Sequence, residues 1–212
     1  MNTILFDLDG TLLNTLKDLQ NSVNYALEQQ GYPLRNIEEI RNFVGDGVAM
    51  LIHRSVPTQT TPEAEAHCLS IFKEHYMIHM YDNTKPYDGI LPLLYQLKEK
   101  GYRLGIVSNK LESAVQGLAK DYFENLFDVA IGDVPSRNKK PAPDSVLAAI
   151  QQLSVRPSDC LYIGDTNIDV ETAHNAGIVC VGVTWGFRDR SVLLDAKADY
   201  IIDTPEQLFS VL

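Results

Sequence analysis

Two acidic residues stand one position apart near the start of the chain, directly after a short apolar run. The run is Ile4–Phe6 and the acids are Asp7 and Asp9, followed by Gly10 and Thr11. Such a run is typical of a buried strand, where an unpaired carboxylate would cost several kcal/mol. A divalent cation would compensate both charges, and oxygen ligands suit Mg²⁺. The sequence therefore predicts a Mg²⁺ site at the end of the first strand.

Other polar residues follow later apolar runs in the same way. Ser108 and Asn109 follow residues 104–107, Lys140 lies in the loop after residues 127–131, and Asp165 follows residues 160–164. In an open parallel sheet, ligands bind outside the carboxyl ends of the strands. We therefore expect these side chains to converge on Asp7 and Asp9.

This set of residues suits phosphoryl transfer, which needs an in-line nucleophile, charge neutralisation and a proton donor for the leaving oxygen. Asp7 can serve as the nucleophile and form an aspartyl-phosphate. Asp9 can protonate the leaving group and then deprotonate water. We assign phosphate binding to Thr11, Ser108, Asn109 and Lys140.

The metal also needs carboxylates from elsewhere in the chain. Asp165 can complete the set begun by Asp7, and Asp169, four residues later, can orient the metal's surroundings. The expected cofactor is Mg²⁺, although Mn²⁺ accepts similar oxygen ligands.

The elements that position these residues alternate between strand and helix from Tyr102 onward. Apolar runs and amphipathic segments predict strands at 104–107, 127–131, 160–164 and 179–183, with helices at 112–120, 144–153 and 167–176. This alternation predicts an α/β fold with a doubly wound parallel sheet.

Residues 14–85 instead show only helical patterns. Thr15 with Asp18 resembles a capping box, Asn36 with Glu39 offers a second, and Thr61 begins a third helix. We therefore expect a catalytic core of residues 1–13 and 86–212 and an all-helical cap of residues 14–85. Hinges are expected near residues 13–15 and 85–87.

Composition limits the function. The 212 residues carry a net charge of −10, which argues against binding to nucleic acid or an anionic membrane. No apolar run is long enough to span a bilayer, and the first strand leaves no room for a signal peptide. Three widely spaced cysteines suit reduced thiols. We expect a cytoplasmic protein, a monomer or weak homodimer, that acts on a small phosphorylated metabolite.

Four segments resemble the motifs of the haloacid dehalogenase superfamily. They are Asp7–Thr11, Ser108–Lys110, Lys140–Pro141 and Gly164–Asp169. The resemblance implies a Mg²⁺-dependent phosphatase with an α-helical cap, and it adds the backbone carbonyl of Asp9 to the metal ligands Asp7 and Asp165. Dehalogenating members lack the second aspartate, so Asp9 disfavours that chemistry.

Within the cap, residues 42–47 resemble the loop of phosphoglycolate-phosphatase-like members. Gly45, Asp46 and Gly47 are therefore expected to contribute to specificity. The alternatives are a phosphosugar mutase, or a pyrophosphatase or nucleotidase of the same superfamily. A non-enzymatic phospho-acceptor module similar to a receiver domain is disfavoured, because receivers carry the acceptor aspartate on a later strand and have no cap.

Overall fold

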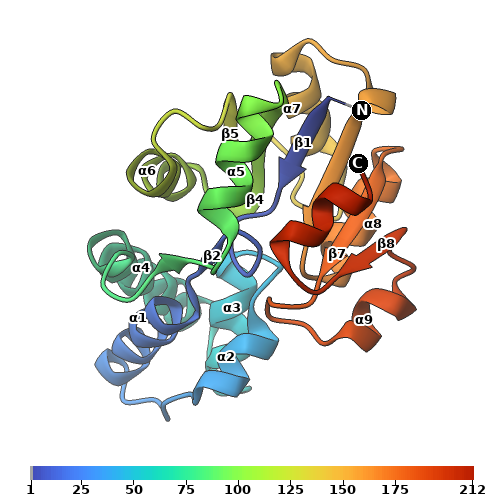
Figure 1. The fold of residues 1–212 in the computed structure, drawn as a ribbon. Coiled ribbons are helices and arrows are strands. Elements are labelled where there is room, and N and C mark those ends of the chain that lie inside the picture. Colours follow the sequence, from blue (N-terminus) through green and yellow to red (C-terminus); the bar gives the residue numbers. More distant parts are fainter. Residues whose placement is uncertain (1) are drawn as a thin grey trace.

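The computed structural model describes residues 2–212, which form a six-stranded parallel sheet with a group of helices at one end (Figure 1). The strand order is β5-β4-β1-β6-β7-β8. The strands are β1 (Thr3–Phe6), β4 (Arg103–Leu111), β5 (Val129–Asp133), β6 (Cys160–Gly164), β7 (Val179–Val183) and β8 (Tyr200–Ile202).

The strand order reverses beside β1. The chain passes from β1 outward to β4 and β5, then returns to β6 on the other side of β1 and continues to β7 and β8. Phe6, the last residue of β1, is in register with Ile106 and Ile163. Residues that follow β1, β4 and β6 therefore meet at the topological switch point, where open α/β sheets bind ligands.

Helices cover both faces of the sheet because side chains alternate along each strand. Ile4 and Phe6 share a hydrophobic cluster with α5 (Ile90–Glu99) and α6 (Glu112–Phe123). Leu5 faces the opposite way, toward α7 (Asp144–Leu153), α8 (Asn167–Asn175) and α9 (Arg190–Asp195). The short 3₁₀ helices η1 (Pro157–Asp159) and η2 (Pro205–Ser210) complete the core. The predicted α/β fold with a doubly wound parallel sheet is confirmed.

The remaining helices lie between β1 and α5. They are α1 (Leu16–Gln29), α2 (Ile37–Phe43), α3 (Val48–Ser55) and α4 (Pro62–His79), and α1 packs on α4. The short strands β2 (Leu13–Asn14) and β3 (Lys85–Pro86) pair antiparallel and carry the chain into and out of this group (Figure 1). We use the name cap for residues 14–85. The two short strands lie where we expect hinges.

One predicted helix cap is wrong. Thr15 precedes α1, but its side chain makes no capping bond and instead donates to Asp9. The Asp18 carboxylate accepts hydrogen bonds from the backbone amides of Asn83 and Thr84, which ties the two ends of the cap together. Contacts outside the helix therefore replace the local cap at α1.

The other two predicted caps are present. Asn36 and Glu39 form a reciprocal capping box at α2. The Thr61 side chain accepts from the Ala64 amide at the start of α4.

Element boundaries differ modestly from the sequence pattern. β5 begins at Val129 rather than at 127, because Phe127 packs edge-on against Phe6 and Phe123 and the Asp128 carboxylate accepts from the Leu104 amide. Helices α3, α5 and α9 and strands β2, β3 and β8 were not among the predicted elements. Across residues 2–212, no helix has both the length and the apolar character needed to cross a bilayer.

Candidate active site

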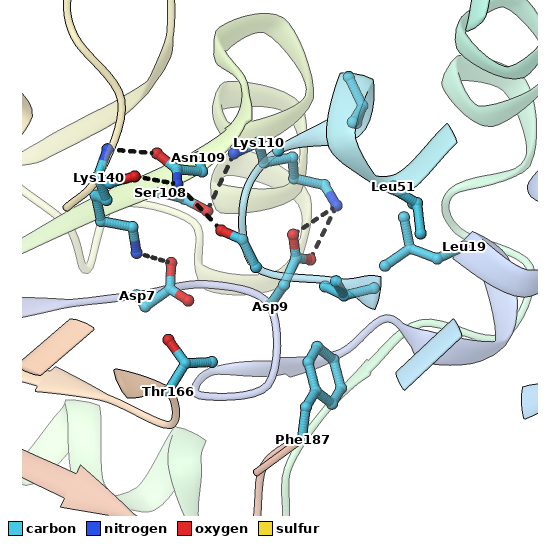
Figure 2. Close-up of a pocket in the computed structure, with 14 residues that line it drawn as sticks. Asp7, Asp9, Leu19, Leu51, Ser108, Asn109, Lys110, Lys140, Thr166 and Phe187 are labelled. Carbon is cyan, nitrogen blue, oxygen red and sulfur yellow. Dashed lines mark hydrogen bonds and ion pairs between the residues drawn. The ribbon is translucent and has the colours of Figure 1, made fainter. Parts of the chain in front are cut away.

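Asp7 lies at the switch point, buried directly beyond the end of β1. Its amide donates to the Ile163 carbonyl at 2.8 Å, which continues the β1–β6 pairing by one residue. Its Oδ1 atom is 2.9 Å from Lys140 Nζ (Figure 2). Burial raises the pKa of Asp7 to about 6; Lys140 opposes the shift and Asp169 adds to it. The carboxylate is thus poorly hydrated and beside one cation.

Three buried carboxylates gather here. Asp7, Asp165 and Asp169 each place an oxygen within 4.8 Å of the others. Burial raises the pKa of Asp165 well above its usual value, and repulsion from Asp169 and Asp7 adds to that rise. Lys140 is the cation in ion-pair contact with two of the three. The cluster therefore carries uncompensated negative charge, and its all-oxygen donor set fits a divalent cation such as Mg²⁺.

Two loops hold Asp165 in place, the loop after β1, which carries Thr11, and the loop after β7, which carries Phe187. Thr11 donates its hydroxyl to Asp165 Oδ1 at 3.2 Å, and the Phe187 amide donates to Oδ2 at 2.7 Å. Gly10 has φ +87°, and a Cβ atom there would lie 2.4 Å from Asp165 Oδ2. Only glycine allows this approach. The structure thus turns the Thr11 hydroxyl, expected on phosphate, toward the carboxylate cluster.

Lys140 is held from several sides. Its ammonium group donates to Asp169 Oδ1 at 2.7 Å and to the Tyr162 hydroxyl at 3.0 Å. Burial alone would lower the pKa of Lys140, but Asp169 and Asp7 outweigh it and raise the pKa well above its usual value. Lys140 is therefore a fixed positive charge. Asp169, expected to orient the metal's surroundings, also orients this lysine.

The Asn109 side chain makes its hydrogen bonds to backbone groups. It accepts from the Lys140 amide at 2.8 Å and donates at 3.0 Å to the carbonyls of Lys140 and of Gly45 in the cap (Figure 2). These contacts position the Lys140 segment and link it to the cap. Ser108, one residue earlier, lines the cavity, and its hydroxyl accepts from the Lys110 amide at 3.4 Å.

Asp9 faces the opposite side of the cavity and is paired with Lys110. Lys110 Nζ lies 2.9 and 3.1 Å from the two Asp9 oxygens, and it donates to the hydroxyl of Tyr76 in α4 at 2.6 Å. The Lys110 side chain is only 2% exposed. Thr15 donates to Asp9 from the base of the cap at 2.7 Å. The expected acid/base is thus held jointly by core and cap.

Lys110 ends the second motif segment, but the sequence assigned no function to it or to Tyr76. For Lys110 a signal existed, because alternate strand residues share a face and Lys110 stands two positions after Ser108. For Tyr76 none existed, since it belongs to an ordinary apolar stripe on a helix far away in sequence.

The cap covers the cavity with residues 44–48. Gly45 and Gly47 line it, whereas Asp46 pairs with Arg54 at 2.6 Å and is not among the lining residues. A Cβ atom at Gly47 would lie 3.3 Å from the Asn109 carbonyl, so the cap loop and the core are in close contact. Thr166 and Phe187 also line the cavity and were not anticipated.

Comparison with known proteins agrees with this geometry. The haloacid dehalogenase-like hydrolase family matches residues 4–183. The chain belongs to this family. Among curated relatives, the phosphoglycolate phosphatase of Aquifex aeolicus (strain VF5) is 31% identical over all of this chain and 97% of its own length. The pyrophosphatase PpaX of Bacillus mycoides (strain KBAB4) is 28% identical with the same coverage.

Solved structures agree as well. A crystal structure from Lactobacillus delbrueckii subsp. bulgaricus superposes with a TM-score of 0.94 at 35% identity, and the match covers 99% of this chain and 97% of that one. Membership of the haloacid dehalogenase-like hydrolases and these relatives make the protein an enzyme of the phosphatase type.

Proposed function

We propose that this haloacid dehalogenase-like phosphatase hydrolyses a small phosphate monoester through an aspartyl-phosphate on Asp7, with Mg²⁺ as cofactor. The observation that carries the proposal is the position of Asp7, which lines the cavity beside the ammonium of Lys140 and clusters with the carboxylates of Asp165 and Asp169. A second acid, Asp9, lines the same cavity, where Lys110 and Thr15 hold its carboxylate.

The residues divide the work as follows. A carboxylate oxygen of Asp7 forms a bond to phosphorus while the bond from phosphorus to the ester oxygen breaks, and Asp9 gives that oxygen its proton. Asp9 then takes a proton from water as the water attacks phosphorus, which releases phosphate and restores Asp7. Lys140 and the Ser108 hydroxyl offset the charge on the transferring group.

The metal would be held by Asp7, Asp165 and the backbone carbonyl of Asp9. When bound, Mg²⁺ supplies positive charge that neutralises the phosphoryl oxygens and the crowded carboxylates. Asp169 and Thr11 keep Lys140 and Asp165 in place for it.

The substrates named for the relatives are phosphoglycolate and pyrophosphate, both small phosphorylated compounds. We take a small phosphorylated metabolite as the substrate of this chain as well. We also infer a cytoplasmic enzyme, because Cys68, Cys160 and Cys180 are free and buried, as suits a reducing compartment.

The test is Mg²⁺-dependent phosphate release from p-nitrophenyl phosphate, together with acid quenching of the reaction to trap phosphate on the protein. The Asp7→Asn variant should lose release by at least about 10⁴-fold and trap no phosphate, since its amide cannot attack phosphorus. Asp195→Asn, an exposed position at the end of α9, should match the unmodified enzyme. Activity retained in Asp7→Asn would contradict the proposal.

A further inference from the structure

The side of the cavity that receives the leaving group is apolar. Leu19 of α1, Val44, and Val48 and Leu51 of α3 line it from the cap, and Phe187 lines it from the core. Figure 2 shows Leu19, Leu51 and Phe187 grouped on the side where Asp9 lies, while Lys140 lies with Asp7. The other cap residues in the lining are Gly45 and Gly47, which offer only backbone.

The two cations in this lining already have partners. Lys140 contacts Asp7 and Asp169, and Lys110 contacts Asp9 and Tyr76. Among residues 2–212, the lining contains no other lysine, arginine or histidine. A charged leaving group would therefore have to take a lysine away from the catalytic carboxylates.

Cations just outside the lining are also engaged. Lys139, whose ammonium would lie 3.2 Å from a Cβ atom at Gly47, pairs with Asp133 at 2.9 Å. Arg54 pairs with Asp46, and Arg188 donates to the carbonyls of residues 41, 42 and 44. Lys139 and Arg54 therefore each have a carboxylate partner, and Arg188 is held in place by backbone carbonyls.

The space is small as well. The volume that the centres of water molecules can occupy in the cavity is about 40 Å³. One water molecule needs about 10–15 Å³ on this measure, so the cavity has room for roughly three. A leaving group that stays in contact with the wall is therefore short.

From these observations we infer that the substrate is the phosphate monoester of a short, uncharged alcohol whose carbon chain packs against Leu19, Val44, Val48, Leu51 and Phe187. This inference rests on the proposed function and narrows it. A carboxylate or a second phosphate on the leaving group would be desolvated against apolar side chains beside Asp7 and Asp9, and both lysines of the lining already pair with carboxylates. Phosphoglycolate and pyrophosphate are then poor substrates, although relatives of this chain are named for them.

The test compares two esters that have equal numbers of non-hydrogen atoms, isobutyl phosphate and phosphoglycolate. Both are assayed with the full-length Mg²⁺ enzyme, and p-nitrophenyl phosphate serves as a general substrate. We expect kcat/KM for isobutyl phosphate to exceed that for phosphoglycolate by at least about tenfold. A kcat/KM for phosphoglycolate equal to or above that for isobutyl phosphate would overturn the inference while leaving the phosphatase activity intact. No Mg²⁺-dependent release from any of the three would remove the proposed function, and this inference with it.

Variants at Val48, one of the apolar side chains that line the cavity, test the inference directly. Val48→Arg places a cation at the start of α3 and should raise the ratio of phosphoglycolate to isobutyl phosphate activity by about tenfold or more. Val48→Met adds length without charge and should leave the ratio within about threefold. An unchanged ratio in a folded Val48→Arg, checked by circular dichroism, would contradict the inference.

Lys139 offers a second check that leaves the wall intact. If the inference holds, Lys139→Ala keeps the ratio of the two activities, because Lys139 pairs with Asp133 and takes no part in binding the leaving group. A selective loss of phosphoglycolate hydrolysis in this variant would identify Lys139 as the counter-ion of a carboxylate and overturn the inference.

Discussion

Asp7 and Asp9, the carboxylates that we propose carry the reaction, are held by different lysines. Asp7 contacts Lys140, which also binds Asp169, whereas Asp9 contacts Lys110, which also binds Tyr76. Burial alone would lower the pKa of Lys110, but Asp9 and Tyr76 outweigh it and raise that pKa above its usual value. Both lysines are therefore permanent charges that hold the two acids in different positions.

Lys110→Met should weaken catalysis in a way that depends on the leaving group, because it releases Asp9 from its position. Acid catalysis contributes about 10²–10⁴-fold, and it matters most for poor leaving groups. We expect about a 10²-fold loss of kcat for an alkyl phosphate and less than about tenfold for p-nitrophenyl phosphate. Steady-state kinetics on both esters measure this.

Tyr76→Phe is the matched variant for that experiment. It removes the hydroxyl but keeps the ring, whose centre lies 4.6 Å from Lys110 Nζ, so it should cost less than Lys110→Met on the alkyl ester. Equal losses of Lys110→Met on both esters would show that Lys110 supports folding or binding and does not position the acid.

At the scale of elements, cap and core are joined by two arginines that reach in opposite directions. Arg41 of α2 donates to the carbonyls of Gly186 and Phe187, at 3.1 and 2.9 Å. Arg188 of the core donates to cap carbonyls, including that of Val44 at 2.6 Å. These bonds hold the loop that carries Phe187 against the loop that carries Gly45, across the mouth of the cavity. Together with the short β2–β3 pair, they define a closed arrangement.

Removing both arginines should favour an open cap. In Arg41→Ala/Arg188→Ala we expect KM to rise by about tenfold or more and proteolysis within residues 14–85 to accelerate, because closure orders the site and excludes water. Limited proteolysis and steady-state kinetics measure the two effects. Arg190→Ala removes an exposed pair with Asp203 on the same side of the core and serves as the control. The same proteolysis rate in the double variant and the control would contradict a role in closure.

At the scale of the whole molecule, the buried carboxylate cluster lowers the free energy of unfolding as long as no cation is bound. The folded pKa of Asp7, about 6, lies above its unfolded value of 3.8, so protonation favours the folded state. This contribution is fully present below pH 3.8 and is lost as the pH rises through 6. Asp165 shifts in the same direction. These groups therefore destabilise the metal-free folded protein more at neutral pH than at acidic pH.

Mg²⁺ should thus stabilise the protein more at pH 7.5 than at pH 5. At 100 times its Kd, a ligand adds about 2.7 kcal/mol, which for a chain of this size raises Tm by about 5–10 °C. We expect such a rise at pH 7.5 and a smaller one at pH 5, where protons compete for the carboxylates. Scanning calorimetry with NaCl at matched ionic strength separates metal binding from charge screening.

Asp165→Asn is the matched variant for the calorimetry. It removes one of the crowded charges, so at pH 7.5 it should raise the Tm of the metal-free protein and reduce the response to Mg²⁺. A Mg²⁺ response that is undiminished in Asp165→Asn would show that Asp165 does not form part of the metal site.

The sequence by itself determined the class of fold and the region of the active site. Strand-like runs that end in Asp7, Ser108 and Asp165 are local signals, and parallel connection brings their ends to one edge whatever the details of packing. The capping box at Asn36 and Glu39 is equally local, and it was predicted correctly. These features depend on residues that are close together in the sequence, so the sequence pattern alone is enough to predict them.

Only the tertiary structure decided which hydrogen-bond partners the polar side chains of the site take. Thr15 bonds Asp9 rather than capping its own helix, Asn109 bonds backbone around Lys140, and Thr11 bonds Asp165. Tyr76 reaches Lys110 across 34 positions of sequence. A buried polar group takes whichever partner the packed fold brings within about 3 Å, and that proximity is a property of the assembled molecule.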